Sequence, residues 1–252
     1  MPRLFGIELA TCTMDEIVAT LREPPTGARA LPLFTLNVAH VASLRRSAAF
    51  RHAYRSAWRA TVDGMPILVV SRLKGLGLHR IAGADLVTAL FATRVAGMRP
   101  FFVASSEATA QAIRERLVAR GFADGDLAFV VPPFGFETDA AYSQALAARV
   151  KAHGTTHLLM GVGAPKSEIW VVARKAELGG CYALCVGAGL DFLAGTKARA
   201  PVVLRDTGFE WAWRLYSEPR RLARRYLVDA FAFLYIVAFR KLDLEKDEQS
   251  AS

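Results

Sequence analysis

The segment Leu158–Val186, LLMGVGAPKSEIWVVARKAELGGCYALCV, determines the fold of the chain. It begins with a short apolar run over Leu158–Val162 and then makes a glycine-containing turn. A helix is predicted from about Lys166 to Leu178, and a second apolar run follows at Cys181–Val186. Two short apolar runs that flank a helix of about a dozen residues are typical of a β-α-β unit, in which the two strands are parallel.

The same alternation of apolar runs and helices continues upstream of this unit. Further strands are predicted at Leu33–Val38, Ala60–Val62, Pro100–Ala104 and Leu127–Val131. The sequence therefore predicts an α/β fold whose sheet is mainly parallel and flanked by helices.

Capping signals predict where the helices begin. Thr13 and Glu16 have the spacing of a capping box, which predicts a first helix over 14–22. Four further helices follow from similar signals. One carries Arg45, Arg46, Arg51 and Arg55 and extends to about Trp58, and the next has Pro66 in its first turn. A third is predicted over 107–120 with Ser105 or Ser106 as its cap, and a fourth runs from a Thr138 cap to about His153.

The composition is that of a folded, basic protein. Of the 252 residues, 53% are hydrophobic and 22% are charged, which is enough for a full core. The net charge of +9 indicates an anionic partner, the alternative being a generally basic surface. Cys12, Cys181 and Cys185 suit a reducing compartment, and all three are expected to be buried packing residues. Cys181 and Cys185 would lie about 13 Å apart in one strand, which excludes a disulfide between them.

The C-terminal segment Lys197–Lys241 combines arginines with apolar and aromatic residues. Its arginines cluster in the first half, at Arg214, Arg220, Arg221, Arg224 and Arg225. The second half, Tyr226–Phe239, has Asp229 as its only charge and is too short to span a bilayer. We expect this segment to lie on an anionic membrane surface; the alternative is a solvated cationic face. No nucleic-acid-binding module accompanies the arginines, so nucleic acid is not an expected partner.

The sequence predicts three regions along the chain. An α/β core is expected over 1–196, a helical appendage that associates with membranes over 197–244, and a disordered tail over 245–252. Within the appendage, Pro219 suits the first turn of a helix that begins near residue 218. No signal peptide is recognised at the start of the chain, which favours a cytoplasmic location.

Polar and glycine residues follow several of the predicted strands. They are Thr35 and Asn37, Asp63 and Gly64, the segment Gly161–Lys166, and the segment Gly187–Asp191. Because ligands of parallel sheets bind beyond the carboxyl ends of the strands, these residues are expected to converge on one site.

Two of these elements suggest specific chemistry. The turn Gly161–Glu168 leads into a helix, whose free N–H groups can bind an anion. A dinucleotide fingerprint would require a third glycine where Lys166 stands, and no Walker sequence is present. Asp63 at a strand end could serve as a general base, although aspartate before glycine is also ordinary in turns.

Two sequences imitate metal sites. Asp124-Gly125-Asp126 resembles a metal-binding DxD, but it precedes a predicted strand and so lies at the wrong end of the sheet. His153 and His157 have the spacing of an HxxxH pair, but Gly154 would break the helix that aligns them. We therefore expect a surface turn at the first sequence and no metal at either.

Several motifs together resemble the WecG/TagA/CpsF family of bacterial glycosyltransferases. They are TLN at Thr35–Asn37, VDGMP at Val62–Pro66, RIAGADL at Arg80–Leu86, GVGAPKSE at Gly161–Glu168, VGAGLDFLAG at Val186–Gly195, RAP at Arg199–Pro201 and GFEWAWRLYSEPRRLARRYL at Gly208–Leu227. The resemblance is collinear from about residue 30 to 227. It implies a Rossmann-like core whose C-terminal appendage closes the site.

The resemblance implies an inverting enzyme at the cytoplasmic membrane face. Such enzymes move a sugar from a nucleotide-diphosphate donor to a polyprenyl-diphosphate-linked sugar for exopolysaccharide or cell-wall polymer synthesis, and a UDP-sugar is the expected donor. Asp63 is then the general base, beside Thr35. The donor pocket is expected to comprise Asn37, Arg80, Gly83, Asp85, Gly163, Pro165, Lys166 and Glu168. Thr35 and Asp191 are also expected to bind substrate. Diphosphate is expected to be bound by Arg214, Arg221 and Arg224.

The resemblance implies neither an essential metal nor a cofactor. Family members usually have glutamine where this chain has Ser167 and glutamate where it has His79, so the donor sugar, the acceptor sugar and the polymer stay open. An exposed apolar C-terminal segment would favour homo-oligomers. The alternatives are a non-catalytic membrane adaptor with the same fold and, disfavoured by the missing glycine, a nicotinamide-dependent oxidoreductase.

Overall fold

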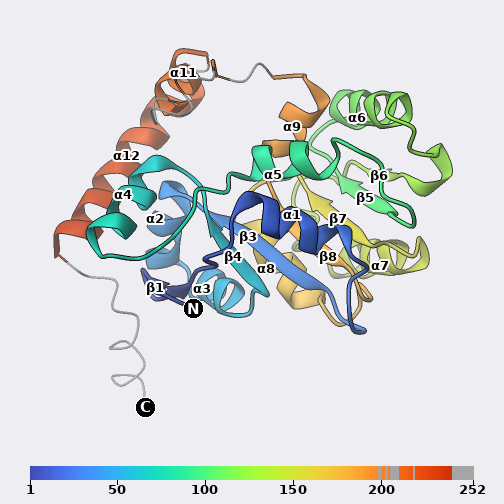
Figure 1. The fold of residues 1–252 in the computed structure, drawn as a ribbon, viewed down its shortest axis with the longest axis horizontal. Helices are drawn as coiled ribbons and strands as arrows, with labels where there is room; N and C mark the ends of the chain where they lie inside the picture. Colours follow the sequence, from blue (N-terminus) through green and yellow to red (C-terminus); the bar gives the residue numbers. More distant parts are fainter. Residues whose placement is uncertain (198–199, 202–203, 205–209, 218, 240–252) are drawn as a thin grey trace.

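The computed structural model describes residues 1–197, 200–201, 204, 210–217 and 219–239. Figure 1 shows a central sheet with helices on both sides, and the C-terminal helices α11 (Glu210–Ser217) and α12 (Pro219–Phe239) at one end of the molecule. The other α-helices are α1 (Met14–Arg22), α2 (Val38–Arg46), α3 (Ala48–Arg55), α4 (Met65–Leu73), α5 (Gly83–Leu90), α6 (Glu107–Ala119), α7 (Ala140–Ala152), α8 (Lys166–Arg174) and α9 (Gly189–Ala194).

Six strands form the central sheet in the order β4-β3-β8-β7-β5-β6, and each neighbouring pair is parallel. They are β3 (Leu31–Leu36), β4 (Arg59–Val62), β5 (Pro100–Val103), β6 (Ala128–Val130), β7 (His157–Met160) and β8 (Tyr182–Cys185). A short antiparallel pair, β1 (Arg3–Leu4) and β2 (Ile7–Glu8), precedes them. The predicted α/β class with a mainly parallel sheet is confirmed.

The strand register brings the carboxyl ends of the strands to one edge of the sheet. Phe34 of β3 and Met160 of β7 both pair with Cys185 of β8, and Leu36 of β3 pairs with Val62 of β4. We call this edge the carboxyl edge. The segments that follow β3, β4, β7 and β8 therefore begin next to one another.

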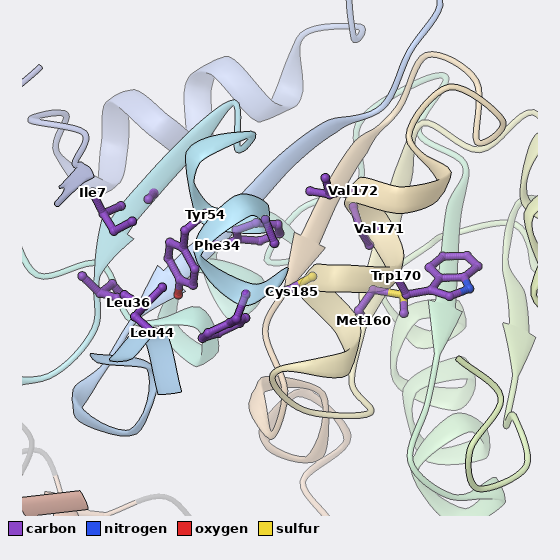
Figure 2. Close-up of a cluster of buried hydrophobic side chains, with 14 of the residues drawn as sticks. Ile7, Phe34, Leu36, Leu44, Tyr54, Met160, Trp170, Val171, Val172 and Cys185 are labelled. Carbon is purple, nitrogen blue, oxygen red and sulfur yellow. The ribbon is translucent and has the colours of Figure 1, made fainter. Parts of the chain in front are cut away.

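Two apolar clusters cover the two faces of the sheet. One contains residues of α1, α5, α6 and α9, and the other contains residues of α2, α3, α4, α7, α8 and α12. Figure 2 shows part of the second cluster, where Phe34 and Tyr54 lie near Cys185, and Trp170 of α8 lies beside Met160. Burial of this apolar surface on both faces supplies most of the driving force for the fold.

The capping predictions are confirmed in part. Glu16 N–H donates to the Thr13 hydroxyl over 3.3 Å, and Thr13 N–H donates to the Glu16 carboxylate over 2.8 Å, which completes the predicted capping box. The single helix predicted up to Trp58 is wrong. Helix α2 ends at Arg46, and the hydroxyl of Ser47 accepts from Phe50 N–H over 3.1 Å to start α3.

The start of α7 and the burial of one cysteine also differ from prediction. Asp139 caps α7, because its carboxylate accepts from Tyr142 N–H over 2.9 Å, whereas the Thr138 hydroxyl donates to a carbonyl of the preceding turn. Cys181 and Cys185 are buried free thiols, as predicted, but Cys12 is only half-buried. A short side chain at the end of a loop can remain near the surface even when it touches the core.

Helix α12 packs one face against the core and leaves the other exposed. Phe233 and Ile236 join the second cluster, and the Phe233 ring lies 5.8 Å from that of Phe5. Val228, Phe231 and Leu234 lie on the exposed face. Among the described residues, no helix has the length and hydropathy needed to cross a membrane. The predicted tail over 245–252 lies outside the described residues.

Candidate active site

Asp63 lies at the carboxyl edge beside the end of β3. Its backbone N–H donates to the carbonyl of Leu36 over 2.8 Å, which continues the β3–β4 pairing by one residue. Gly64 follows with a φ of +103°, a conformation that glycine adopts without strain, and α4 begins at the next residue. The sheet therefore fixes the backbone that carries the Asp63 carboxyl, and the side chain stays half-exposed.

Thr35 and Asn37 occupy the neighbouring strand end, as predicted. Thr35 pairs with Thr61 in the β3–β4 register, and it is buried. The side-chain oxygen of Asn37 accepts from His40 N–H over 3.0 Å and caps α2. Asn37 therefore has a structural role in addition to the donor-binding role predicted for it.

The segment that contains Arg80, Gly83 and Asp85 also reaches this edge. Arg80 forms a parallel bridge with Val62, and its guanidinium lies 3.4 Å from the Asp85 carboxylate. A Cβ atom on Gly83 would lie 3.3 Å from the Cα of Val186 and 3.4 Å from the Thr35 hydroxyl. A side chain at this position would therefore press on the ends of β3 and β8, which glycine avoids.

The turn Gly161–Glu168 joins β7 to α8 at the same edge. Gly163 has a φ of +87°, and Ser167 is buried with its hydroxyl donating to the Gly163 carbonyl over 2.9 Å. Lys166 is the first residue of α8, so its charge adds to the positive end of the helix dipole. This combination favours an anion at the turn.

Glu168 is buried rather than open to this site. Burial raises the pKa of its carboxyl to about 7, and its Oε2 has no hydrogen-bond partner among the described residues. The pKa of the buried Tyr54 is also raised, chiefly by burial and further by Glu168, Cys185 and Asp63. Tyr54 therefore interacts electrostatically with Glu168, Cys185 and Asp63.

Asp191 lies at the start of α9 and bonds to the β5–α6 connection. Its Oδ1 accepts from the hydroxyls of Ser105 and Thr109, over 3.2 Å and 3.1 Å, and Lys197 lies 3.5 Å from its Oδ2. This residue connects α9 to α6 in addition to the substrate-binding role predicted for it.

The three arginines predicted to bind diphosphate lie on the C-terminal helices. Arg214 belongs to α11, and Arg221 and Arg224 belong to α12, which starts at Pro219 as the sequence predicts. Their side chains lie outside the described residues. Their role in binding diphosphate therefore stays a prediction.

The sequence model of the glycosyl transferase WecG/TagA/CpsF family matches residues 2–247. The chain belongs to this family. It is accordingly a glycosyltransferase, and the resemblance inferred from its motifs is confirmed.

Two curated relatives come from Staphylococcus aureus. The protein of strain MW2 is 24% identical over 251 residues, which cover 96% of this chain and 95% of the relative. The protein of strain MRSA252 is 23% identical over the same length. Each is named as an N-acetylglucosaminyldiphosphoundecaprenol N-acetyl-β-D-mannosaminyltransferase.

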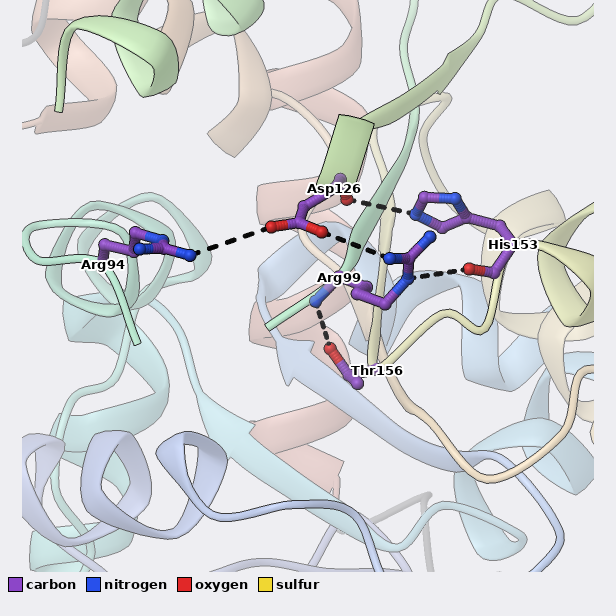
Figure 3. A network of polar contacts seen from close by, with 5 residues as sticks. All are labelled: Arg94, Arg99, Asp126, His153 and Thr156. Carbon is purple, nitrogen blue, oxygen red and sulfur yellow. Dashed lines mark hydrogen bonds and ion pairs between the residues drawn. The ribbon is translucent and has the colours of Figure 1, made fainter. Parts of the chain in front are cut away.

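In this glycosyltransferase the two sequences that resemble metal sites, Asp124–Asp126 and the pair His153 and His157, lie away from the carboxyl edge. Figure 3 shows Asp126 between Arg99, at 3.2 Å, and Arg94, at 4.0 Å, with His153 bonded to the Asp126 carbonyl. Arg99 directly precedes β5, so this network lies at the amino end of the sheet, as predicted for a surface turn. His157 instead faces the Leu21 carbonyl at 2.7 Å, and burial lowers its pKa to about 4.

Phe134 is a candidate site residue that the sequence analysis missed. It lies fully exposed in the connection that follows β6, and the Lys166 ammonium lies 5.5 Å from its ring. Both residues follow strands whose carboxyl ends share the same edge. The only sequence signal was an aromatic residue between prolines and a glycine, in PPFGF, and this did not distinguish the exposed Phe134 from the buried Phe136.

Proposed function

We propose that this glycosyltransferase moves a sugar from a nucleotide-diphosphate donor to a polyprenyl-diphosphate-linked sugar, with inversion at the anomeric carbon of the transferred sugar. The expected donor is a UDP-sugar. The observation that carries the proposal is the position of Asp63. Its backbone is fixed by the sheet next to Thr35 and Asn37, while its carboxyl stays half-exposed. A half-exposed carboxylate on a rigid strand end suits a general base.

Asp63 acts on the acceptor. Its carboxylate takes the proton from the acceptor hydroxyl as that oxygen bonds to the anomeric carbon of the donor sugar. The bond between this carbon and the phosphate oxygen breaks on the opposite face, and its electrons leave with the nucleotide diphosphate. A single displacement of this kind inverts the anomeric configuration.

Cationic groups stabilise the departing diphosphate. Lys166 at the start of α8 and Arg80, which bridges to the last residue of β4, lie at the carboxyl edge, and a fixed positive charge near developing negative charge lowers the barrier. Arg214, Arg221 and Arg224 would add to this charge from the C-terminal helices. No cofactor is part of the proposal.

The exposed ring of Phe134 supports a nucleotide donor. It lies beside Lys166, and aromatic side chains commonly stack on nucleobases. A nucleobase on this ring would place its diphosphate toward the start of α8. The donor sugar is not specified by these contacts, since Ser167 is buried and turned toward Gly163.

Two observations support a membrane-bound acceptor. The S. aureus relatives are named for an acceptor with an undecaprenyl diphosphate. In this chain, α12 exposes Val228, Phe231 and Leu234, a face that suits the apolar boundary of a membrane. The protein would thus work at the cytoplasmic face of the membrane as a peripheral enzyme.

The experiment is transfer from labelled nucleotide sugars to a short-chain lipid diphosphate that carries N-acetylglucosamine. We expect transfer from at least one nucleotide sugar, and NMR of the product should show the anomeric configuration opposite to that of the donor. Retention would exclude the single displacement. Persistent failure of all donors, with intact binding to vesicles, would favour a non-catalytic membrane adaptor.

A further inference from the structure

Helix α4 exposes an apolar stripe on its outer face. Val69 and Leu73, one helical turn apart, are 47% and 82% exposed, whereas Ile67, Leu68 and Val70 are buried on the inner face. Residues spaced by four lie on one side of a helix, so Val69 and Leu73 form a continuous stripe. An α-helix of the catalytic core thus ends in an apolar tip.

Two cations flank this tip. Arg72 and Lys74 are both exposed, and they lie on either side of Leu73 in the sequence. The chain then turns at Gly75, whose φ is +68°. An exposed leucine between two cations at the end of a helix is typical of a membrane-binding surface. The cations contact anionic lipid headgroups, and the leucine inserts at the boundary of the acyl chains.

The position of α4 relates this tip to the carboxyl edge. The helix begins at Met65, two residues after Asp63, and its nine residues extend about 13 Å. The apolar tip is therefore separated from Asp63 by about the length of this helix.

The tip also lies at the same end of the molecule as α12. Figure 1 shows α4 and α12 at the end opposite α6. Ile67 and Val70 of α4 belong to the same apolar cluster as Phe233 and Ile236 of α12, while both helices keep apolar side chains exposed on their outer faces. The exposed apolar residues of α4 and of α12 thus lie at the same end of the molecule.

We propose that Val69, Arg72, Leu73 and Lys74 form a membrane-docking site in the catalytic core itself, one that binds an anionic bilayer independently of the C-terminal helices. This inference extends the proposed function by adding a second contact with the membrane. It rests on the proposed function only in assuming that the acceptor reaches Asp63 from the membrane.

A second copy of the chain is a poorer occupant of this surface. Two apolar side chains cover far less than the roughly 800 Å² that each partner of a stable protein interface buries. A chain with a net charge of +9 would also bring further positive charge toward Arg72 and Lys74. An anionic lipid surface matches both the small area and the charge.

The test is binding of the full chain to phosphatidylglycerol–phosphatidylcholine vesicles, measured by co-sedimentation. We expect the double substitution Val69→Glu and Leu73→Glu to weaken binding at least about tenfold, because full burial of one leucine already corresponds to about that factor. The matched control is Val118→Glu on α6, a valine 44% exposed at the opposite end, which should bind as the wild type does. Equal binding by the double variant would overturn the proposal.

A second pair of substitutions separates charge from apolar contact. Arg72→Gln with Lys74→Gln should weaken binding to anionic vesicles and leave binding to pure phosphatidylcholine unchanged. If instead light scattering shows that the wild type is a dimer and that Leu73→Glu makes it monomeric, the stripe is an interface between copies and the proposal fails.

Turnover with a water-soluble, short-chain acceptor distinguishes docking from catalysis. The Val69→Glu, Leu73→Glu variant should keep wild-type turnover in this assay, since neither residue belongs to the proposed active site. A loss there equal to the loss on vesicles would mean that the substitutions damage the fold, and the docking site would be rejected. If the wild type transfers no sugar at all, the proposed function fails while the vesicle result still decides the docking site.

Discussion

The carboxyl edge of the sheet and helix α12 hold their side chains in different ways. At the carboxyl edge, Asp63 follows a strand that pairs directly with β3, and Gly83 brings α5 within contact of Thr35 and Val186. Helix α12 is attached mainly through α2 and through the buried side chains of Phe233 and Ile236. The difference is that the sheet fixes the backbone at the carboxyl edge, whereas α12 is held by a few buried side chains on one face.

The largest effect is expected where α12 is attached. Phe233, 6% exposed, packs its ring 5.8 Å from that of Phe5, so Phe233→Ala should weaken the docking of α12 by about 3–5 kcal/mol. Phe231→Ala is the matched control, because Phe231 is 71% exposed. Hydrogen exchange of the full chain should show faster exchange in α12 for the first variant and unchanged exchange in β3. If the two variants exchange alike, α12 is not held by its buried face.

The raised pKa of the buried Glu168 can be tested through its effect on the stability of the protein. Its pKa of about 7 in the folded protein exceeds the ordinary 4.5, so the stability contributed by its protonated form is fully present below pH 4.5 and is lost as pH rises through 7. The difference between the two pKa values corresponds to about 3 kcal/mol. Glu168→Gln, which cannot ionise, should therefore gain about this much stability relative to wild type between pH 4.5 and pH 8.

Urea denaturation of both proteins across this pH range measures the difference. The free energy of unfolding of the variant should rise relative to that of the wild type with increasing pH. A difference independent of pH would show that Glu168 titrates normally and that its carboxyl is solvated.

Gly83 tests how closely the carboxyl edge is packed. The Cβ atom of Gly83→Val would lie 3.3 Å from the Val186 backbone, so the start of α5 must move away from Thr35. A displacement of about 1 Å at a catalytic site can reduce turnover about 10²-fold. Gly125→Val is the control, since a Cβ at that position has nothing within 4 Å. Normal transfer by the Gly83 variant would mean that α5 does not help to shape the site.

The smallest effect is expected at the ion pair between α2 and α12. Arg46 lies 3.7 Å from Asp229, whose side chain is 11% exposed, but the Arg46 side chain is 60% exposed, so water screens the interaction at the arginine. Arg46→Gln should cost less than about 1 kcal/mol in the free energy of unfolding. A loss comparable to that of Phe233→Ala would show that charge, rather than apolar burial, attaches α12.

The features that could be predicted from the sequence are those that depend only on residues close together in the chain. The Thr13 capping box, the apolar strands and the helix start at Pro219 need only a few adjacent side chains. The capping box was located correctly, and the strand ends lie within two residues of their predicted positions, since β3 ends at Leu36 instead of Val38. Helix α5 was missed because its apolar residues follow a turn without a side-chain cap. Helices α2 and α3 were joined because a serine within a helical pattern gave no sign that it would cap a new helix.

The candidate site could likewise be predicted only in part from the sequence. The strand-end positions of Thr35, Asn37 and Asp63 followed from the rule for parallel sheets, and the register confirms them. The burial of Glu168 could not be predicted, because it depends on the packing of α8 against α3, which is distant in the sequence. The exposure of Phe134 likewise depends on how the connection after β6 leaves the sheet.

The single-turnover rate of sugar transfer by Asp63→Asn tests the central claim most directly. The amide has nearly the shape of the carboxylate but cannot accept the acceptor proton, so donor affinity should be unchanged while the rate falls about 10²–10⁴-fold. The measurement uses saturating nucleotide sugar and a short-chain lipid-diphosphate acceptor. A rate equal to that of the wild type would contradict the assignment of Asp63 as the general base.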